Sequence, residues 1–366
     1  MKLIVAGGGT GGHLFPGIAV AEEFLAQDSS NQVLFVGSER GLEAKLIPRL
    51  GYQLELISAA GIKGKGTLAK FSGAMQLLYG YAQSRTILKQ FKPDLVLGVG
   101  GYASLPMVMA AKGMEIPRFI HEQNALPGMA NKFLSKFADK VFISLEESSR
   151  FFTAEKTILT GNPLRKQILE SLSKDSNNMG TASEKGDKFH LFIFGGSQGA
   201  RPLNQVVPAA IALMQDKLEQ LQIVHQTGEA DLSMVQDGYR QAGIKADVQP
   251  FIDDMAKQYQ QADLIICRSG ATTIAEITAV GRTCLFIPFP HAADDHQRKN
   301  AEALLKKNAC VLMLERNMTP ENLATAIGDL MDDQEKLQQI AANAAALGRT
   351  DAARLIVNEM LELTGL

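Results

Sequence analysis

The strongest constraint on the fold is an alternation of two patterns along the whole chain. Short apolar runs of β-type residues alternate with longer segments in which apolar residues recur at helical spacing. Strands separated by helices predict an α/β fold of βαβ units, with parallel sheets covered by helices on both faces. The predicted strands are KLIVA, QVLFVG, DLVLGVG, RFIHE and KVFIS in the first half, and LFIFGG, QIVHQTG, DVQPFI, DLIICRSG and CLFIPFP in the second.

The two halves resemble each other, which indicates a duplicated architecture. Each begins with an apolar strand that runs into a glycine-rich turn, GGGTGGH from Gly7 and GGSQGA from Gly195. The segments DLVLGVGGYAS and DLIICRSGATT form a second matching pair. We therefore predict two nucleotide-binding-type domains, 1–162 and 163–345, and a C-terminal helix in 346–366 whose packing the sequence does not define. The polar segment 171–188 has the composition of a loop or linker.

Composition excludes several classes of protein. A chain of 366 residues that is 46% hydrophobic and 21% charged can bury a core larger than one domain usually has. Its cysteines, Cys267, Cys284 and Cys310, lack the paired spacing of a disulfide framework or a Cys-rich zinc site. No apolar run reaches the roughly 18 residues that a membrane-spanning helix requires. The net charge is −2, but basic residues outnumber acidic ones up to Thr160, which fits an anionic partner.

The first glycine-rich turn is a candidate phosphate-binding loop that carries a histidine. Gly7, Gly9 and Gly12 match G-x-G-x-x-G between a strand and a helix, where backbone N–H groups and the helix dipole favour an anion. His13 follows directly, and the positive end of the dipole disfavours its protonated form. A neutral imidazole suits a general base. The alternative is a helix-start histidine that only hydrogen-bonds the loop.

The second half carries two further candidate anion sites. Ser197 lies in the turn GGSQGA, where its hydroxyl is a possible additional donor to phosphate. RSGATT ends a strand and starts a helix whose second turn contains Glu276. That carboxylate is placed to accept hydrogen bonds from ribose hydroxyls, or else it stabilises its own helix.

Two polar clusters predict contacts to a sugar or phosphate. The residues HEQN, from His121 to Asn124, follow a strand at the end where open α/β sheets bind ligands. A second cluster, PHAADDHQ, contains His291, His296 and Gln297 but lacks a recognisable metal-ligand spacing. We therefore expect hydrogen bonding to a ligand there, and no metal.

A lysine-bearing segment is a candidate membrane contact. GIKGKGTLAKF, from Gly61 to Phe71, is followed by LLYGY and mixes Lys63, Lys65 and Lys70 with apolar and aromatic residues. It fits an anionic bilayer surface, or an ordinary loop leading into a core helix. The segment is not arginine-rich and the chain has no tryptophan, so nucleic-acid binding gains little support.

Together these motifs resemble the MurG family, bacterial cell-wall transferases that move N-acetylglucosamine from UDP-N-acetylglucosamine to lipid I, the undecaprenyl-pyrophosphoryl-muramoyl-pentapeptide. The matching segments run in order from residue 8 to residue 301, and jointly they are highly specific. They are GGTGGHLFPGIAVA, GGYAS, HEQNALPG, GNPLR, GGSQGA, RSGATTIAE and PHAADDHQ, with Asn300-Ala301 after it.

The resemblance implies a glycosyltransferase-B fold, in which two facing Rossmann-like domains flank an active-site cleft. It implies an acceptor site mainly in the first domain and a donor site mainly in the second. The implied substrate contacts are Thr10, Gly11 and Gly12 at the phosphates, Asn124 and Gln297 at the sugar, Arg165 and Ser197 at the diphosphate, the Ile252 backbone at uracil, and Ala271, Thr272, Thr273, Ile274, Ala275 and Glu276 at the phosphate and ribose.

The implied reaction is inverting transfer to the 4-hydroxyl of the muramoyl unit, which forms lipid II and UDP in peptidoglycan synthesis and so serves cell shape and division. His13 is the expected base, and no metal or cofactor is expected because helix N-termini and Arg165 face the charge on UDP. The implied location is the cytoplasmic face of the inner membrane, as a peripheral protein. His296 stands where some relatives have glutamine, which leaves its contact with the sugar open.

Three alternatives remain at this point. A dinucleotide-dependent oxidoreductase fits the first glycine loop, with Glu39 past the second strand as a ribose ligand. A two-domain sugar-nucleotide receptor would bind without turnover. Another glycosyltransferase-B enzyme would act on a different glycolipid, such as diacylglycerol.

Overall fold

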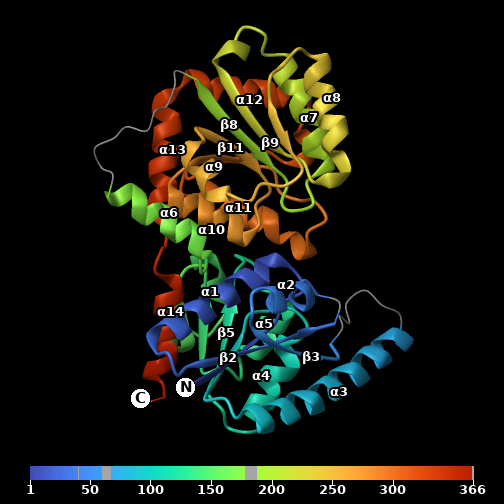
Figure 1. Ribbon diagram of the computed structural model, residues 1–366, viewed down its shortest axis with the longest axis vertical. Coiled ribbons are helices and arrows are strands. Elements are labelled where there is room, and N and C mark those ends of the chain that lie inside the picture. Colours follow the sequence, from blue (N-terminus) through green and yellow to red (C-terminus); the bar gives the residue numbers. More distant parts are fainter. Residues whose placement is uncertain (40, 60–66, 178–187, 365–366) are drawn as a thin grey trace. The chain divides into compact units, whose positions relative to one another are not determined.

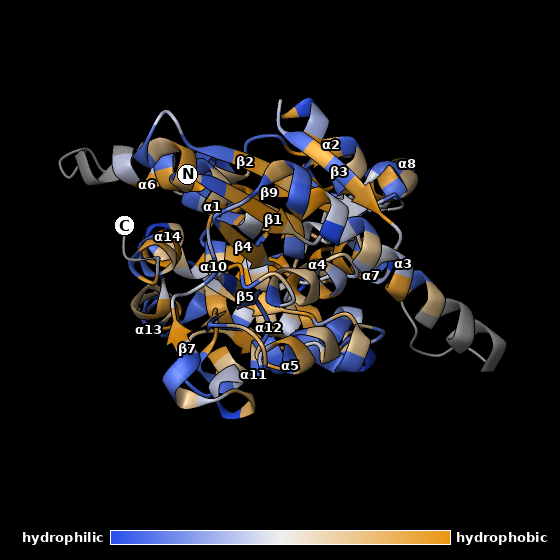
Figure 2. Cartoon of the chain, turned by 90° about the horizontal axis from the view of Figure 1, so that it is seen from below, coloured by the Kyte–Doolittle hydropathy of each residue, from blue (hydrophilic) through white to orange (hydrophobic). Residues whose placement is uncertain are grey.

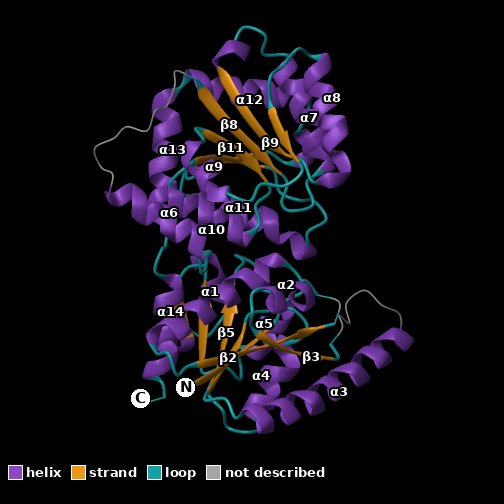
Figure 3. Ribbon diagram, in the orientation of Figure 1, coloured by secondary structure: helices purple, strands orange, loops and turns teal. Residues whose placement is uncertain are grey.

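The structure is a computed structural model that describes residues 1–39, 41–59, 67–177 and 188–364. The chain divides into two compact units, one of Met1–Arg165 with Arg349–Leu366 and one of Lys166–Gly348. Each unit is a parallel sheet with helices on both faces (Figures 1 and 3). Lys63 and Lys65 of the proposed membrane segment, and most of the polar segment 171–188, lie outside the described residues.

The first unit contains a seven-stranded parallel sheet. The central strands are buried on both faces because helices cover each side, as β1 shows: Leu3 and Val5 face one apolar cluster, and Ile4 and Ala6 face the other. The strand order is β3 (Gln53–Ile57), β2 (Gln32–Ser38), β1 (Lys2–Ala6), β4 (Leu95–Gly98), β5 (Arg118–Glu122), β6 (Lys140–Ile143) and β7 (Thr157–Leu159).

Helices of the first unit divide between the two faces of this sheet. One apolar cluster takes residues from α1 (Gly11–Gln27), α2 (Glu43–Arg49) and α14 (Ala352–Glu362). The other takes residues from α3 (Thr67–Phe91), α4 (Ser104–Lys112) and α5 (Met129–Leu134). The C-terminal helix α14 therefore packs on the first unit, where Ile356, Val357 and Met360 are fully buried beside α1.

The second unit repeats this plan with six parallel strands. The order is β10 (Asp247–Gln249), β9 (Leu221–Gln226), β8 (Phe189–Phe194), β11 (Leu264–Cys267), β12 (Thr283–Phe286) and β13 (Val311–Leu312). One face packs on α7 (Arg201–Ala212), α8 (Leu232–Gln241), α12 (Pro320–Asp332) and α13 (Gln334–Leu347). On the other face, Phe192 and Phe194 pack against Tyr259 of α9 (Met255–Gln261). The remaining helices are α6 (Lys166–Asn177), α10 (Ala271–Val280) and α11 (His296–Leu305).

The structure confirms the predicted fold class and all ten predicted strands. Sequence reasoning missed β3, β7 and β13, which all lie at sheet edges and are short or half-exposed. The three cysteines are free and buried. Hydropathy colouring shows the strands as predominantly hydrophobic (Figure 2). Among the described residues, no helix is long and apolar enough to cross a bilayer.

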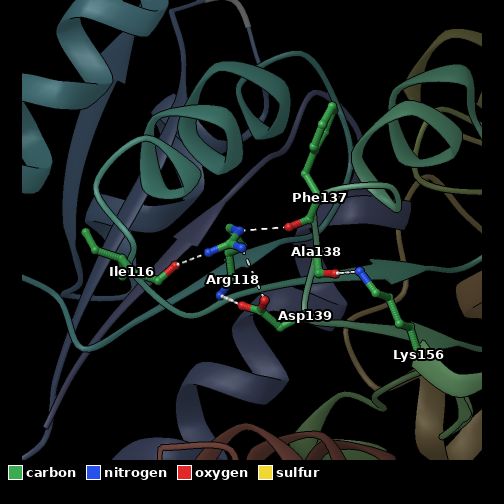
Figure 4. Close-up of polar contacts among 6 residues, drawn as sticks. All are labelled: Ile116, Arg118, Phe137, Ala138, Asp139 and Lys156. Carbon is green, nitrogen blue, oxygen red and sulfur yellow. Dashed lines mark hydrogen bonds and ion pairs between the residues drawn. The ribbon is translucent and has the colours of Figure 1, made fainter.

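At its N-terminal end, β5 is fixed to the segment before β6 by a polar network around Arg118 (Figure 4). The Arg118 guanidinium donates to the carbonyls of Ile116 and Phe137 at 3.0 and 2.8 Å and to Asp139 Oδ1 at 3.2 Å. The backbone N–H of Arg118 donates to the other carboxylate oxygen, 2.9 Å away. Lys156 donates to the Ala138 carbonyl, 2.8 Å away. Side-chain hydrogen bonds thus hold β5, which carries the HEQN segment at its opposite end.

We predict that Arg118→Met lowers the free energy of unfolding by about 2 kcal/mol, because it leaves two part-buried carbonyls and the Oδ1 atom of Asp139 without their side-chain donor. Urea denaturation measures this change. Arg240→Met is a control, since Arg240 pairs with Asp237 on the surface and its loss should change the free energy of unfolding by less than about 0.5 kcal/mol. Equal effects of the two variants would contradict a structural role for the network.

Candidate active site

The first glycine turn places His13 in the first turn of α1. The chain leaves β1 at Ala6, passes Gly7 to Gly9, and enters α1 after Thr10, whose carbonyl accepts the first helical hydrogen bonds from His13 and Leu14. The N–H groups of Gly11 and Gly12 are the first two of the helix and have no partner within it. Because α1 begins just after the carboxyl end of β1, the positive end of its dipole lies at the carboxyl edge of the sheet.

A buried carboxylate occupies part of this turn. Glu43 is 1% exposed, and its Oε2 accepts the Gly9 N–H at 2.7 Å while its Oε1 accepts the N–H and hydroxyl of Ser38 at 2.8 and 2.9 Å. A Cβ on Gly8 or Gly41 would come within 2.3 or 2.1 Å of Glu43 Oε2. The Gly9 amide thus binds a carboxylate of the chain itself, whereas the Gly11 and Gly12 amides have no partner within the helix.

The imidazole of His13 contacts Gln123 of the HEQN segment, and the absence of a side chain at Gly100 leaves space for the ring. His13 Nδ1 lies 3.0 Å from Gln123 Oε1. A Cβ on Gly100, which has φ +93°, would come within 2.8 Å of the same Nδ1 atom. Gly100 is therefore required both by its backbone conformation and by the ring packed against it.

Within the HEQN segment, Glu122 and Asn124 are joined by hydrogen bonds. Glu122 is buried, and its carboxylate accepts hydrogen bonds from the Asn124 N–H, the Gly128 N–H and the Asn131 side chain at 2.9 to 3.1 Å. Asn124 Nδ2 also reaches Glu122 Oε1, 3.2 Å away. Glu122 thereby shapes the loop that presents Asn124 at the edge of the sheet.

His121 is buried, and burial lowers its pKa from 6.5 to about 4. Its Nε2 lies 3.3 Å from the Gly161 carbonyl oxygen and 3.2 Å from Ser144 Oγ. Its Nδ1 lies 3.0 Å from Gln123 Nε2. The imidazole is therefore neutral near pH 7 and connects the HEQN segment to the chain just before Arg165.

Arg165 belongs to the first unit and lies beside α1. Its guanidinium carbon is 5.6 Å from the centre of the Phe15 ring, two residues beyond His13. The structure thus brings four predicted site regions of the first unit to the carboxyl edge of its sheet: the turn at Thr10 to Gly12, His13, Asn124 and Arg165.

In the second unit, the loop 195–199 follows β8 and precedes α7. Gly199 has φ +75°, and a Cβ there would lie 1.8 Å from the Thr227 carbonyl oxygen. The side chain of Gln226 donates to the Gly196 carbonyl at 3.0 Å, so the end of β9 holds the loop. Ser197 is exposed at its tip.

The start of α10 gathers the remaining predicted contacts. Ala271 to Ala275 form its first turns, and the buried Glu276 accepts a hydrogen bond from the Tyr259 hydroxyl at 3.1 Å. Ser269 Oγ donates to the Gln297 carbonyl at 2.8 Å, and Gln297 Oε1 accepts the Phe289 N–H at 2.9 Å. These contacts place Gln297 next to the α10 N-terminus. Ile252 is buried in the loop after β10.

The polar cluster at 291–297 forms no ligand set in the structure. His296 Nδ1 lies 2.8 Å from the Ala293 carbonyl oxygen, and Asp295 pairs with Arg298. Across the described part of the chain, no three His, Cys, Asp or Glu side chains come together as metal ligands would.

Known proteins that resemble this chain cover its whole length. Residues 3–143 match the glycosyltransferase family 28 N-terminal domain, and residues 190–356 match the C-terminal domain of the same family. A relative from Trichlorobacter lovleyi is 66% identical over 99% of this chain and 98% of its own length. A relative from Geobacter sulfurreducens is 58% identical over 100% and 99%. Both are named UDP-N-acetylglucosamine–N-acetylmuramyl-(pentapeptide) pyrophosphoryl-undecaprenol N-acetylglucosamine transferase. Among solved structures, Acinetobacter baumannii MurG is 32% identical, covers 99% of both chains and gives a TM-score of 0.81.

This chain belongs to the MurG family.

Membership in the MurG family makes the chain a glycosyltransferase and confirms the predicted glycosyltransferase-B fold with two Rossmann-like domains. It removes the oxidoreductase alternative, because the first glycine turn is part of a family 28 domain and not of a dinucleotide site. The individual site residues stay predictions, now with positions in the structure.

Sequence reasoning missed the residues that hold the site together. Glu43, Gly100, Gln123 and Tyr259 each contact a predicted site segment far away in the chain. A signal existed only for Gln123, as part of the HEQN segment, and for Gly100, as part of the paired strand-turn motif. Nothing local marks Glu43 or Tyr259.

The neutral His121 predicts that acid destabilises the fold. Its pKa is about 4 when folded and 6.5 when unfolded, so below pH 6.5 the unfolded chain binds more protons and stability falls. Burial lowers the pKa of His225 to about 3, which acts in the same direction. Each histidine should cost about 2 kcal/mol of unfolding free energy between pH 7 and pH 5.

Urea unfolding at pH 7, 6 and 5 measures this loss. His121→Gln does not titrate in this range, so this variant should lose about 2 kcal/mol less stability than the wild type between pH 7 and pH 5. The same pH dependence in both proteins would contradict a neutral buried His121.

Proposed function

We propose that this chain transfers N-acetylglucosamine from UDP-N-acetylglucosamine to the 4-hydroxyl of the muramoyl unit of lipid I, releasing UDP and forming lipid II. The observation that carries this proposal is the 66% identity, over nearly the full length of both chains, to a relative named for that transfer. The substrate specificity of a glycosyltransferase resides in its site residues, which an acceptor assay tests directly.

The donor is assigned to the second unit. The α10 N-terminus and the loop at Ser197 supply backbone N–H groups for the diphosphate. Glu276, held by Tyr259, accepts hydrogen bonds from the ribose, and the backbone at Ile252 contacts uracil. Gln297 and Asn124 hydrogen-bond the transferred sugar.

The acceptor is assigned to the first unit, where His13 acts as the base. His13 removes the proton of the 4-hydroxyl as this oxygen attacks the anomeric carbon, and the bond to the UDP oxygen breaks on the opposite side. The configuration at the anomeric carbon therefore inverts. Negative charge develops on UDP, and helix N-termini with Arg165 stabilise it. We expect no cofactor and no metal requirement.

The test is transfer of radiolabelled sugar from UDP-N-acetylglucosamine to a lipid I analogue in the presence of a chelator. We predict transfer at an undiminished rate, and diacylglycerol should not serve as acceptor.

His13→Ala should lower kcat about 100-fold or more with the Michaelis constant for the donor nearly unchanged. Gln27→Ala, at the exposed end of the same helix, is the control and should leave both constants unchanged.

Loss of transfer in the presence of the chelator would contradict metal independence. Transfer to diacylglycerol but not to the lipid I analogue would show that lipid I is not the acceptor. Donor binding without transfer to the lipid I analogue would contradict the proposed acceptor. Near-normal kcat in His13→Ala would remove the base assignment.

We also propose that the chain attaches peripherally to the anionic cytoplasmic face of the inner membrane, because its acceptor is a lipid. Support comes from α3, where Met75, Leu78 and Tyr79 are 52%, 63% and 60% exposed. Their spacing places them on one face of the helix. Exposed large apolar side chains grouped in this way favour contact with a bilayer.

Replacing Met75, Leu78 and Tyr79 together by serine should weaken flotation with phosphatidylglycerol-containing vesicles at least about tenfold, because three apolar side chains no longer insert. Leu213→Ser is the matched control, since Leu213 is a 55% exposed leucine of the second unit. Unchanged flotation of the triple variant would exclude this face of α3 as the membrane contact.

A further inference from the structure

The side chain of Gln123 links the His13 ring to the interior of the first unit. It is 1% exposed at the carboxyl end of β5, and it is separated from His13 by 110 positions in the chain. Its amide contacts four groups: the His13 ring, the Val99 carbonyl, the His121 carbonyl and the His121 ring.

Two carbonyl groups fix the orientation of this amide. A backbone carbonyl oxygen only accepts hydrogen bonds, and the Gln123 amide lies 2.9 Å from the Val99 oxygen and 3.4 Å from the His121 oxygen. The –NH₂ group must therefore face these oxygens. The Gln123 carbonyl oxygen consequently faces His13.

His121 supports the same orientation independently. Its Nε2 lies near the Gly161 carbonyl oxygen, 3.3 Å away, so this nitrogen carries the hydrogen. Because burial keeps the ring neutral, Nδ1 is the acceptor, and it lies 3.0 Å from the Gln123 –NH₂. Ser144 Oγ, 3.2 Å from His121 Nε2, donates onward to Asn162 Oδ1 and is compatible with this arrangement.

The consequence reaches His13. Gln123 Oε1 only accepts a hydrogen bond, so in the neutral form of His13 the hydrogen is on Nδ1 and the lone pair is on Nε2. No described residue hydrogen-bonds Nε2. Histidine in water prefers the opposite tautomer, which has no lone pair on Nε2.

We propose that Gln123 is a positioning residue of the transferase, which sets the His13 tautomer so that Nε2 is the atom that takes the proton of the acceptor hydroxyl. This inference rests on the proposed function, in which His13 is the base. The Val99 and Gly161 carbonyls set the donor and acceptor roles of Gln123 and His121, and Gln123 in turn sets those of His13. No proton moves along this chain of hydrogen bonds. The backbone of Gly100 packs against the His13 ring.

The experiment combines kinetics with ¹⁵N NMR of the full chain labelled at histidine. The His13 signals are assigned by their loss in His13→Ala, and the two ring nitrogens report which one carries the hydrogen. In the wild type we expect Nδ1–H. In Gln123→Met, which keeps the length of the side chain but cannot accept from Nδ1–H, we expect a shift toward Nε2–H. We also expect at least about a tenfold loss of kcat, with little change in the Michaelis constant for the donor.

Gln27→Met is the matched control, because it makes the same substitution at the far, exposed end of α1. It should change neither the tautomer nor kcat. The inference is overturned if wild-type His13 carries its hydrogen on Nε2, if Gln123→Met keeps Nδ1–H, or if the tautomer shifts while kcat stays within about twofold of the wild type. The wild-type spectrum decides even if Gln123→Met does not fold. Full turnover in His13→Ala would instead remove the base assignment, whatever tautomer the NMR reports.

Discussion

The carboxylate of Glu43 is the interaction on which the first half of the site depends. A buried carboxylate needs several donors, and Glu43 finds them in Gly9 and Ser38, at the ends of two neighbouring strands. The surrounding glycines leave space for it, which explains why Gly8, Gly37 and Gly41 carry no side chain. Glu43 fixes the turn before α1, and thereby the direction in which the first helical amides and His13 point.

In the second unit, different residues hold the glycine turn and a buried carboxylate. There Gln226 and the Thr227 backbone hold the glycine turn, and Tyr259 holds the carboxylate of Glu276. In both units the parallel strands end at one edge, and the glycine turns after β1 and β8 each lead into a helix N-terminus there. This shared geometry collects the partial positive charge that a substrate pair with two diphosphates requires. The glycine turn of the first unit differs in being followed by a histidine, His13, in the first turn of α1.

The sequence predicted what depends on local pattern. The ten predicted strands are mostly buried on both faces and read as continuous apolar runs, whereas β3 alternates and β13 has two residues. The glycine turns and HEQN were visible because polar or flexible residues follow apolar strands. Local pattern did not predict the contacts of Glu43, Gln123 and Tyr259, which join residues 34, 110 and 17 positions apart. It also did not predict that α14 packs on α1. These contacts depend on how the strands are ordered in the sheets. The candidate site residues were thus easier to predict than the residues that contact and orient them.

The central claim is that one displacement, by a hydroxyl deprotonated at His13, moves the sugar between two substrates. The sugar is α-linked in UDP-N-acetylglucosamine, and a single displacement inverts that centre. The most direct measurement is the proton NMR spectrum of the product formed from a lipid I analogue, in which the coupling of the anomeric proton reports the linkage. The account predicts a β-linked sugar. An α-linked product would contradict it, because a single displacement from the face opposite the departing UDP cannot retain the configuration of the anomeric carbon.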